Sequence, residues 1–115
     1  MNEDGRTAFF LGHIVEAVVR IQSYVQGLDE AGFLGHKLVQ DAVVRNLEVI
    51  GEACSNVRKH DPAFVSAHPE VPWGDAIGNR NALSHGYFNV DYVLAWNTIH
   101  GDLPKLRRAI AALLA

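Results

Sequence analysis

The sequence contains a single cysteine, Cys54, so no disulfide can form within the chain. This fits a reducing compartment, and we expect the protein in the cytoplasm. Cys54 lies in an apolar run, which favours a buried core residue over a reactive thiol. The sequence also lacks the roughly 18 consecutive apolar residues that a membrane span requires. Its acidic beginning does not have the positive charge of a signal peptide, so we expect no association with a membrane.

An excess of basic residues is also missing, because 10 Lys and Arg stand against 13 Asp and Glu, for a formal net charge of -3. Phosphates are bound by clustered Lys and Arg, so this balance argues against a strong general nucleic-acid binder. It is compatible with an enzyme that has a small basic cleft, or with a partner that supplies the positive surface. The six histidines include no pair three to five residues apart, and we expect no metal site.

Apolar residues recur every three to four positions along most of the chain, which is the spacing of one helical face. No segment shows the alternation of a strand. With 49% hydrophobic residues in 115 positions, this pattern predicts one all-α domain over residues 1–115, an up-and-down bundle of four to five helices. The expected elements are a helix at 7–28 between a cap at Asp4 and an end near Gly27, a turn at 29–33, a helix at 34–60, a loop at 61–72, a helix from Pro72 to about Gly86, a helix capped by Asn89 or Asp91, and a last segment to Leu114.

Prolines set two of these boundaries. The second helix should stop before Asp61-Pro62, because proline disfavours helical backbone in the residue that precedes it. Near the end of the chain, Gly101 and Pro104 should break or kink the helix, and Asp102 should cap the segment that follows.

A polar stripe lies on the predicted second helix, where Arg45, Glu48 and Glu52 occupy positions i, i+3 and i+7. One interpretation is a solvated face with a weak surface ion pair. The other is a polar contact to a neighbouring helix, because Asn46 and Glu52 lie within an otherwise apolar run. Arg45, Glu48 and Glu52 are therefore candidate supporting residues of a site.

A denser group of chemical functions lies between positions 80 and 87. Arg80, Asn81, Ser84, His85 and Tyr87 bring a guanidinium, an amide, a hydroxyl, an imidazole and a phenol into eight residues. Arginine binds phosphate with two parallel hydrogen bonds, and histidine transfers protons near neutral pH. Together they suit phosphodiester chemistry without a metal. The alternative is that Asn81, Ser84 and His85 only cap the end of a helix.

Helical geometry restricts how this group can act. Five residues on a regular helix leave Arg80 and His85 roughly 140° apart around the axis. They can face one site only if the helix ends at His85-Gly86, or if the cleft is shared between two chains.

At these residues the sequence resembles the HepT branch of the HEPN superfamily of toxin ribonucleases. Those proteins carry an arginine, a polar residue and, a few positions later, a histidine, here Arg80 to His85, and HepT proteins add a tyrosine that Tyr87 matches. Two departures are Gly12-His13, where relatives more often carry an acidic residue, and Asn79, where an apolar residue is expected. The resemblance covers most of the chain, with further blocks at 41–53, 68–73, 90–96 and 102–104.

The resemblance implies a HEPN-like helical homodimer in which Arg80 and His85 meet in a cleft between subunits and cleave RNA without a metal or other cofactor. Asn81 would support them. The partner would be a minimal nucleotidyltransferase, the antitoxin of a type VII-like toxin–antitoxin system, which transfers AMP from ATP to Tyr87. The alternative is a non-catalytic nucleotide-binding or interaction subunit of a nucleotidyltransferase complex. An intact Arg–His pair favours the ribonuclease, and a surface without a basic cleft would favour the alternative.

Overall fold

The fold is all-α over residues 5–83 and 90–115, the part of the chain that the computed structural model describes, with the side chains of residues 79–83 left out. This confirms the predicted fold class, an all-α HEPN-like bundle. The expected four to five helices are present, and two short helices, α2 and α4, lie between them. The elements are α1 (Arg6–Tyr24), α2 (Glu30–Leu34), α3 (Lys37–His60), α4 (Pro62–Ala67), α5 (Trp73–Leu83), α6 (Tyr92–His100) and α7 (Asp102–Leu114).

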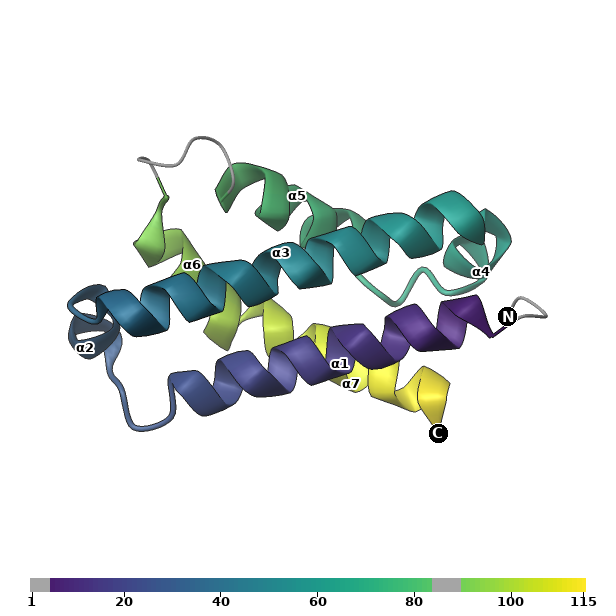
Figure 1. Cartoon of the computed structure of the whole chain (residues 1–115). Helices are drawn as coiled ribbons and strands as arrows, with labels where there is room; N and C mark the ends of the chain where they lie inside the picture. Colours follow the sequence, from purple (N-terminus) through teal and green to yellow (C-terminus); the bar gives the residue numbers. More distant parts are fainter. Residues whose placement is uncertain (1–4, 84–89) are drawn as a thin grey trace.

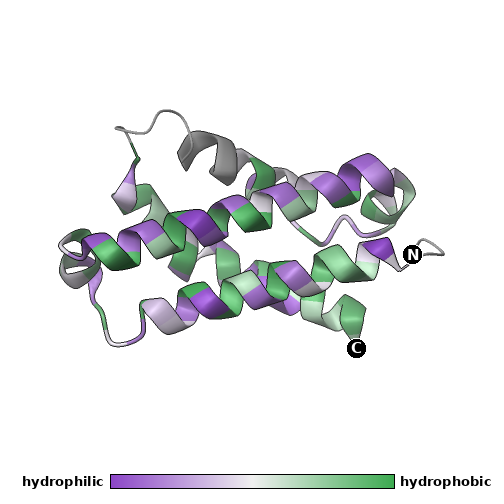
Figure 2. Cartoon of the chain, in the orientation of Figure 1, coloured by the Kyte–Doolittle hydropathy of each residue, from purple (hydrophilic) through white to green (hydrophobic). Residues whose placement is uncertain are grey.

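The two long helices α1 and α3 lie side by side, with α5 packed along α3 and α7 packed along α1 (Figure 1). The short helix α6 joins this arrangement by packing against α2 and α7. Hydrophobic and hydrophilic residues alternate around α1 and α3 (Figure 2), so each helix has one face that can be buried. The largest fully buried side chains are Phe33, Leu11, Ile14, Ile21, Ile50, Leu106 and Ile110.

The first helix is shorter than its apolar pattern predicted. It ends at Tyr24, and the amide of Val25 still bonds to the carbonyl of Ile21 at 3.2 Å. The amide of Leu28 then closes a turn onto the carbonyl of Val25 at 2.9 Å, with Gly27 at a φ of 82°. The left-handed backbone of Gly27 ends the helical path before position 28, although the apolar spacing continues to that point.

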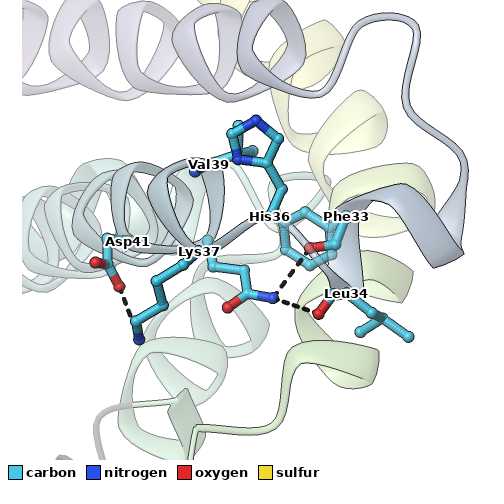
Figure 3. A network of polar contacts seen from close by, with 7 residues as sticks. Phe33, Leu34, His36, Lys37, Val39 and Asp41 are labelled. Carbon is cyan, nitrogen blue, oxygen red and sulfur yellow. Dashed lines mark hydrogen bonds and ion pairs between the residues drawn. The ribbon is translucent and has the colours of Figure 1, made fainter.

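The turn expected at 29–33 is instead the short helix α2. Asp29 caps it by accepting a hydrogen bond from the amide of Gly32 at 2.7 Å. At its other end, the side-chain amide of Gln40 donates to the carbonyls of Phe33 and Leu34 at 3.0 and 2.9 Å (Figure 3). These bonds satisfy carbonyls that a helix end leaves unpaired, and they hold α2 against the first turns of α3.

The end of α3 at His60 agrees with the prediction, and the residue that follows has two functions. One carboxylate oxygen of Asp61 caps α4 by accepting from the amide of Phe64 at 3.3 Å. The other oxygen accepts from the hydroxyl of Thr7 at 2.7 Å. Asp61 therefore joins the start of α1 to the junction of α3 and α4, two segments 54 positions apart in sequence.

The predicted break near the end of the chain is present, but its cap was wrongly assigned. Asp91 caps α6 as expected, by accepting from the amide of Leu94 at 3.0 Å. Asp102 is the first residue of α7, and Gly101 holds the capping position without a side-chain bond. Pro104 is tolerated as the third residue of α7, because the amides of a first helical turn have no partner within the helix.

No helix within residues 5–83 or 90–115 is both long and apolar enough to cross a membrane.

The double role of Asp61 can be measured by comparison with Asp91, whose side chain makes only a capping bond among the described residues. We expect Asp91→Ala to lower the free energy of unfolding by about 1 kcal/mol, a usual value for a lost N-cap. Asp61→Ala should lower it by more, because the bond to Thr7 is lost as well, and Asp61→Asn should recover part of the difference. Urea denaturation followed by circular dichroism measures all three variants. Equal losses for the two alanine variants would show that the bond to Thr7 contributes nothing.

Candidate functional site

The candidate site is carried by α5, whose first turn is fixed by Trp73. The indole ring is buried, and its Nε1–H donates to the carbonyl of His68 at 3.0 Å. The backbone amide of Trp73 bonds to the carbonyl of Val71 at 2.8 Å. Pro72 was expected as the first helical residue, but it precedes the helix, and its carbonyl accepts the first helical bond from Ala76 at 3.1 Å. The loop before α5 therefore sets both the start and the direction of the helix.

One face of α5 is buried against the core. Trp73, Ala76 and Ile77 share this face at the spacing i, i+3 and i+4, and they are exposed by only 5, 9 and 8%. Because α5 packs along α3, this face points toward the long helix. The backbone register places position 80 on the same face, three residues after Ile77 and four after Ala76. The arginine of the motif thus follows directly from the part of α5 that is anchored in the core.

The remaining motif residues follow α5 and precede α6 in sequence. Ser84, His85 and Tyr87, with the expected end of the helix at Gly86, lie outside the described residues, and the side chains of Arg80 and Asn81 are left out as well. The described chain resumes at Val90 and Asp91, directly before α6. The motif therefore links the helix that packs on α3 to the helix that packs on α2 and α7.

The polar stripe of α3 presents two exposed residues and one half-buried residue. Arg45 and Glu52 are exposed, and Glu48 is half-buried. Glu52 lines a hollow of about 240 Å³ between α1 and α3, together with Phe9 and His13 of α1. His13, which belongs to the Gly12-His13 departure from the family pattern, is thus placed on the surface beside the stripe.

Among the described residues, the side-chain hydrogen bond of Asn46 lies inside α3, and the contact to a neighbouring helix that was considered for the stripe stays a prediction. Asn46 is buried, with 7% of its surface exposed, and its amide nitrogen donates to the carbonyl of Ala42 at 2.9 Å, one turn earlier in the same helix. This bond satisfies a polar group inside the helix packing, so Asn46 stabilises α3 itself.

Cys54 is a core residue, as its apolar surroundings predicted. It is fully buried, and burial raises the pKa of its thiol to about 12. Only the thiolate is a strong nucleophile, so a thiol with this pKa is inert at physiological pH.

The described residues also contain no group of three His, Cys, Asp or Glu placed to hold a metal ion.

The sequence analysis did not predict that the ring of His100 is held by a neighbouring residue. The ring of His100 lies 4.1 Å from that of Trp96, and its Nδ1 is 3.0 Å from the carbonyl oxygen of Trp96. Because a carbonyl only accepts, Nδ1 carries the hydrogen of this bond. The signal was available, since an aromatic residue and a histidine four positions apart share one helical face.

The family is established by comparison with known proteins. The model of the HepT-like ribonuclease family matches residues 14–113. A candidate RNase of Methanocaldococcus jannaschii is 35% identical over 101 residues, which cover 88% of this chain and 90% of that protein. A protein of Thermococcus cleftensis named "Probable ribonuclease HepT" is 38% identical over 98 residues, 85% of this chain and 86% of its own. No solved structure matches the chain significantly.

The chain therefore belongs to the HepT-like ribonuclease family. This confirms the resemblance seen in the sequence and, at the level of the family, the expected class of enzyme, a ribonuclease.

Proposed function

We propose that the chain is the toxin of a toxin–antitoxin pair, a metal-independent endoribonuclease whose centre is built from Arg80 and His85. The observation that carries this proposal is the match of the HepT-like ribonuclease family over residues 14–113, a span that includes the whole motif. The anchoring of α5 through Trp73 adds support, because a catalytic group needs a rigid element beneath it. We also propose that residues 1–115 fold as a single domain and act in the cytoplasm.

In the proposed reaction, His85 removes the proton from a ribose 2′-hydroxyl, and the 2′-oxygen attacks the adjacent phosphorus. The bond from phosphorus to the 5′-oxygen breaks, and that oxygen takes a proton, for which the His85 of a second copy is available. Arg80 stabilises the negative charge that builds on the phosphoryl oxygens, and Asn81 supports it. The products are a 2′,3′-cyclic phosphate and a 5′-hydroxyl, and no metal or other cofactor takes part. Ser84, Arg45, Glu48 and Glu52 remain candidate supporting residues.

A homodimer would solve the geometric problem of the motif. On a continuous helix Arg80 and His85 point roughly 140° apart, so one chain cannot aim both at the same phosphate. Two copies that meet at the motif can supply an arginine and a histidine from opposite sides. We expect a dimer whose interface buries at least about 1,000 Å² in total. Static light scattering tests this expectation, and a monomer at micromolar concentration would contradict it.

The catalytic assignment predicts that His85→Ala and Arg80→Ala both abolish most RNA cleavage. A loss of roughly 10²- to 10⁴-fold is typical when a general acid or base is removed. Wild-type activity should persist in EDTA, and mass spectrometry of the fragments should show cyclic phosphate ends. His60→Ala is a suitable control, because His60 is an exposed histidine at the end of α3, outside the motif. Full cleavage by His85→Ala, or activity that EDTA removes and added metal restores, would contradict the mechanism.

We further propose that a partner nucleotidyltransferase silences the enzyme by attaching AMP to Tyr87. The tyrosine oxygen attacks the α-phosphorus of ATP, the bond to the bridging oxygen breaks, and pyrophosphate leaves. The attached phosphate brings negative charge two positions from His85, where it competes for the guanidinium of Arg80. The attached nucleoside occupies space that a substrate nucleotide needs. A covalent block of this kind persists on dilution, whereas a noncovalent inhibitor would dissociate.

Tyr87→Phe therefore should keep the fold and much of the ribonuclease activity, but should escape silencing by the partner with ATP and magnesium. Intact-mass spectrometry should show one added adenylate per wild-type chain and none on the variant. Tyr92→Phe, an exchange of the half-buried tyrosine at the start of α6, controls for the loss of a phenol elsewhere. If Tyr87→Phe is modified and silenced as completely as the wild type, the switch lies at another residue.

A further inference from the structure

A hollow outside the motif lies where the end of α1 meets the corner between α6 and α7. It has a volume of about 330 Å³, near the lower end of the roughly 300–1,000 Å³ range of small-ligand sites. Its walls include the apolar residues Val25, Ile99 and Pro104, and its polar groups come from Gln22, Gln26 and His100. A volume of this size suits one nucleotide better than a larger ligand.

The charge around this hollow distinguishes it from the others. The hollow between α1 and α3 contains the carboxylate of Glu52, and the one at the start of α5 contains that of Asp75. No carboxylate lines the hollow at the α6–α7 corner within the described residues. Arg107, one turn after Pro104 on α7, donates a hydrogen bond to the side-chain oxygen of Gln22, which lines the hollow. The guanidinium of Arg107 is therefore one hydrogen bond away from a wall residue of a hollow that no described carboxylate lines, as an anionic ligand requires.

The imidazole of His100 gives the hollow a fixed polar ring. The Trp96 ring lies against the imidazole, with the ring centroids 4.1 Å apart and the planes tilted by 45°, and the Nδ1–H of His100 bonds to the carbonyl of Trp96 at 3.0 Å. When the ring is neutral, the hydrogen on Nδ1 leaves Nε2 as an acceptor. A ring whose orientation is already set loses little conformational freedom on binding. Unpaired RNA bases are commonly bound by stacking on such rings and by hydrogen bonds to their edges.

We propose that this hollow binds one unpaired nucleotide of an RNA strand, with the base against His100 and the apolar wall and its phosphate on Arg107. The choice of RNA rests on the proposed ribonuclease function, since a free nucleotide has the same chemistry. The hollow would be a second contact for the substrate strand, apart from the motif. It would allow a chain of net charge -3 to hold RNA through a local cation rather than a broad basic surface.

Binding of a fluorescein-labelled pentanucleotide with 2′-O-methyl sugars tests this proposal, because such an RNA cannot be cleaved through its 2′-oxygen. Fluorescence anisotropy of the full-length protein gives the Kd. We expect Arg107→Gln to weaken binding about tenfold, a usual effect for one charge-assisted hydrogen bond. The slope of log Kd against log salt should fall by about 0.7, the value for one phosphate contact of a single strand. Arg108→Gln is the matched control, since this neighbouring exposed arginine, unlike Arg107, has no hydrogen bond to a lining residue of the hollow among the described residues.

A second pair of variants tests the hollow itself. Gln26→Glu places a carboxylate inside it without a change of shape, and should weaken binding severalfold. Ser23→Glu adds the same charge to an exposed residue nearby on α1 that does not line the hollow, and should have little effect. Equal losses within either pair, or no loss in any variant, would overturn the proposal.

Two further measurements distinguish RNA binding from the binding of free nucleotides, and this proposal from the proposed ribonuclease function. AMP that displaces the pentanucleotide at the same concentration as an unlabelled strand would make the hollow a site for free nucleotides, and would overturn the assignment to RNA. Weak competition by AMP supports it. Cleavage is measured separately on an unmodified RNA. If only the first variant of each pair weakens binding and no RNA is cleaved, the ribonuclease proposal alone is refuted. If RNA is cleaved and both variants of each pair weaken binding equally, the proposal for the hollow alone is refuted.

Discussion

The burial of one face of α3 between α1 and α5 is the interaction on which the described fold depends. The buried residues of this face are Val43, Leu47, Ile50, Ala53, Cys54 and Val57. Burying a valine, leucine or isoleucine side chain contributes about 1.5–3 kcal/mol each, so this face dominates the stability of the helix. The ion pair of Lys37 with Asp41 on the same helix is largely exposed and screened by water, and it raises the pKa of Lys37 without adding much to the fold.

This packing also determines how the motif is presented. Helix α5 has no long hydrophobic stretch of its own, and it is held by Trp73, Ala76 and Ile77 against α3 and by the indole bond to His68. These contacts fix the first two turns and leave the motif to follow from them. A reactive group at the end of an anchored helix keeps its position relative to the core, and it can also meet a second chain. The proposed two-chain site needs both properties.

The distribution of charge connects the two proposed RNA contacts. The net charge of -3 argues against a broad basic surface, so we infer that RNA binding relies on a few guanidinium groups in favourable places. Arg80 is one such group by sequence, and Arg107 is another by structure, where its neighbour Gln22 lines a hollow without acid. Phosphates bound at a few points would give a weaker and less salt-sensitive complex than a basic groove. Such a complex would suit an enzyme that releases its products.

Much of this architecture was readable from the sequence, for local physical reasons. Helical periodicity determined the long helices, Asp61-Pro62 stopped α3, and Asp91 capped α6, because these effects act within one or two turns of chain. The motif from Arg80 to Tyr87, together with the further blocks at 41–53, 68–73, 90–96 and 102–104, likewise indicated the family, which the match over residues 14–113 then established.

Only tertiary structure decided the features that depend on distant partners. Nothing local showed that Asp61 would bond to Thr7 or that Gln40 would close the end of α2. The hollow beside His100 also depends on distant partners. Its walls come from positions 22–28 and 99–104, which meet only when α1 packs against α7. Sequence spacing specifies which face of a helix is apolar, but the element that covers this face, and the spaces left at its edges, are set by how whole helices pack together.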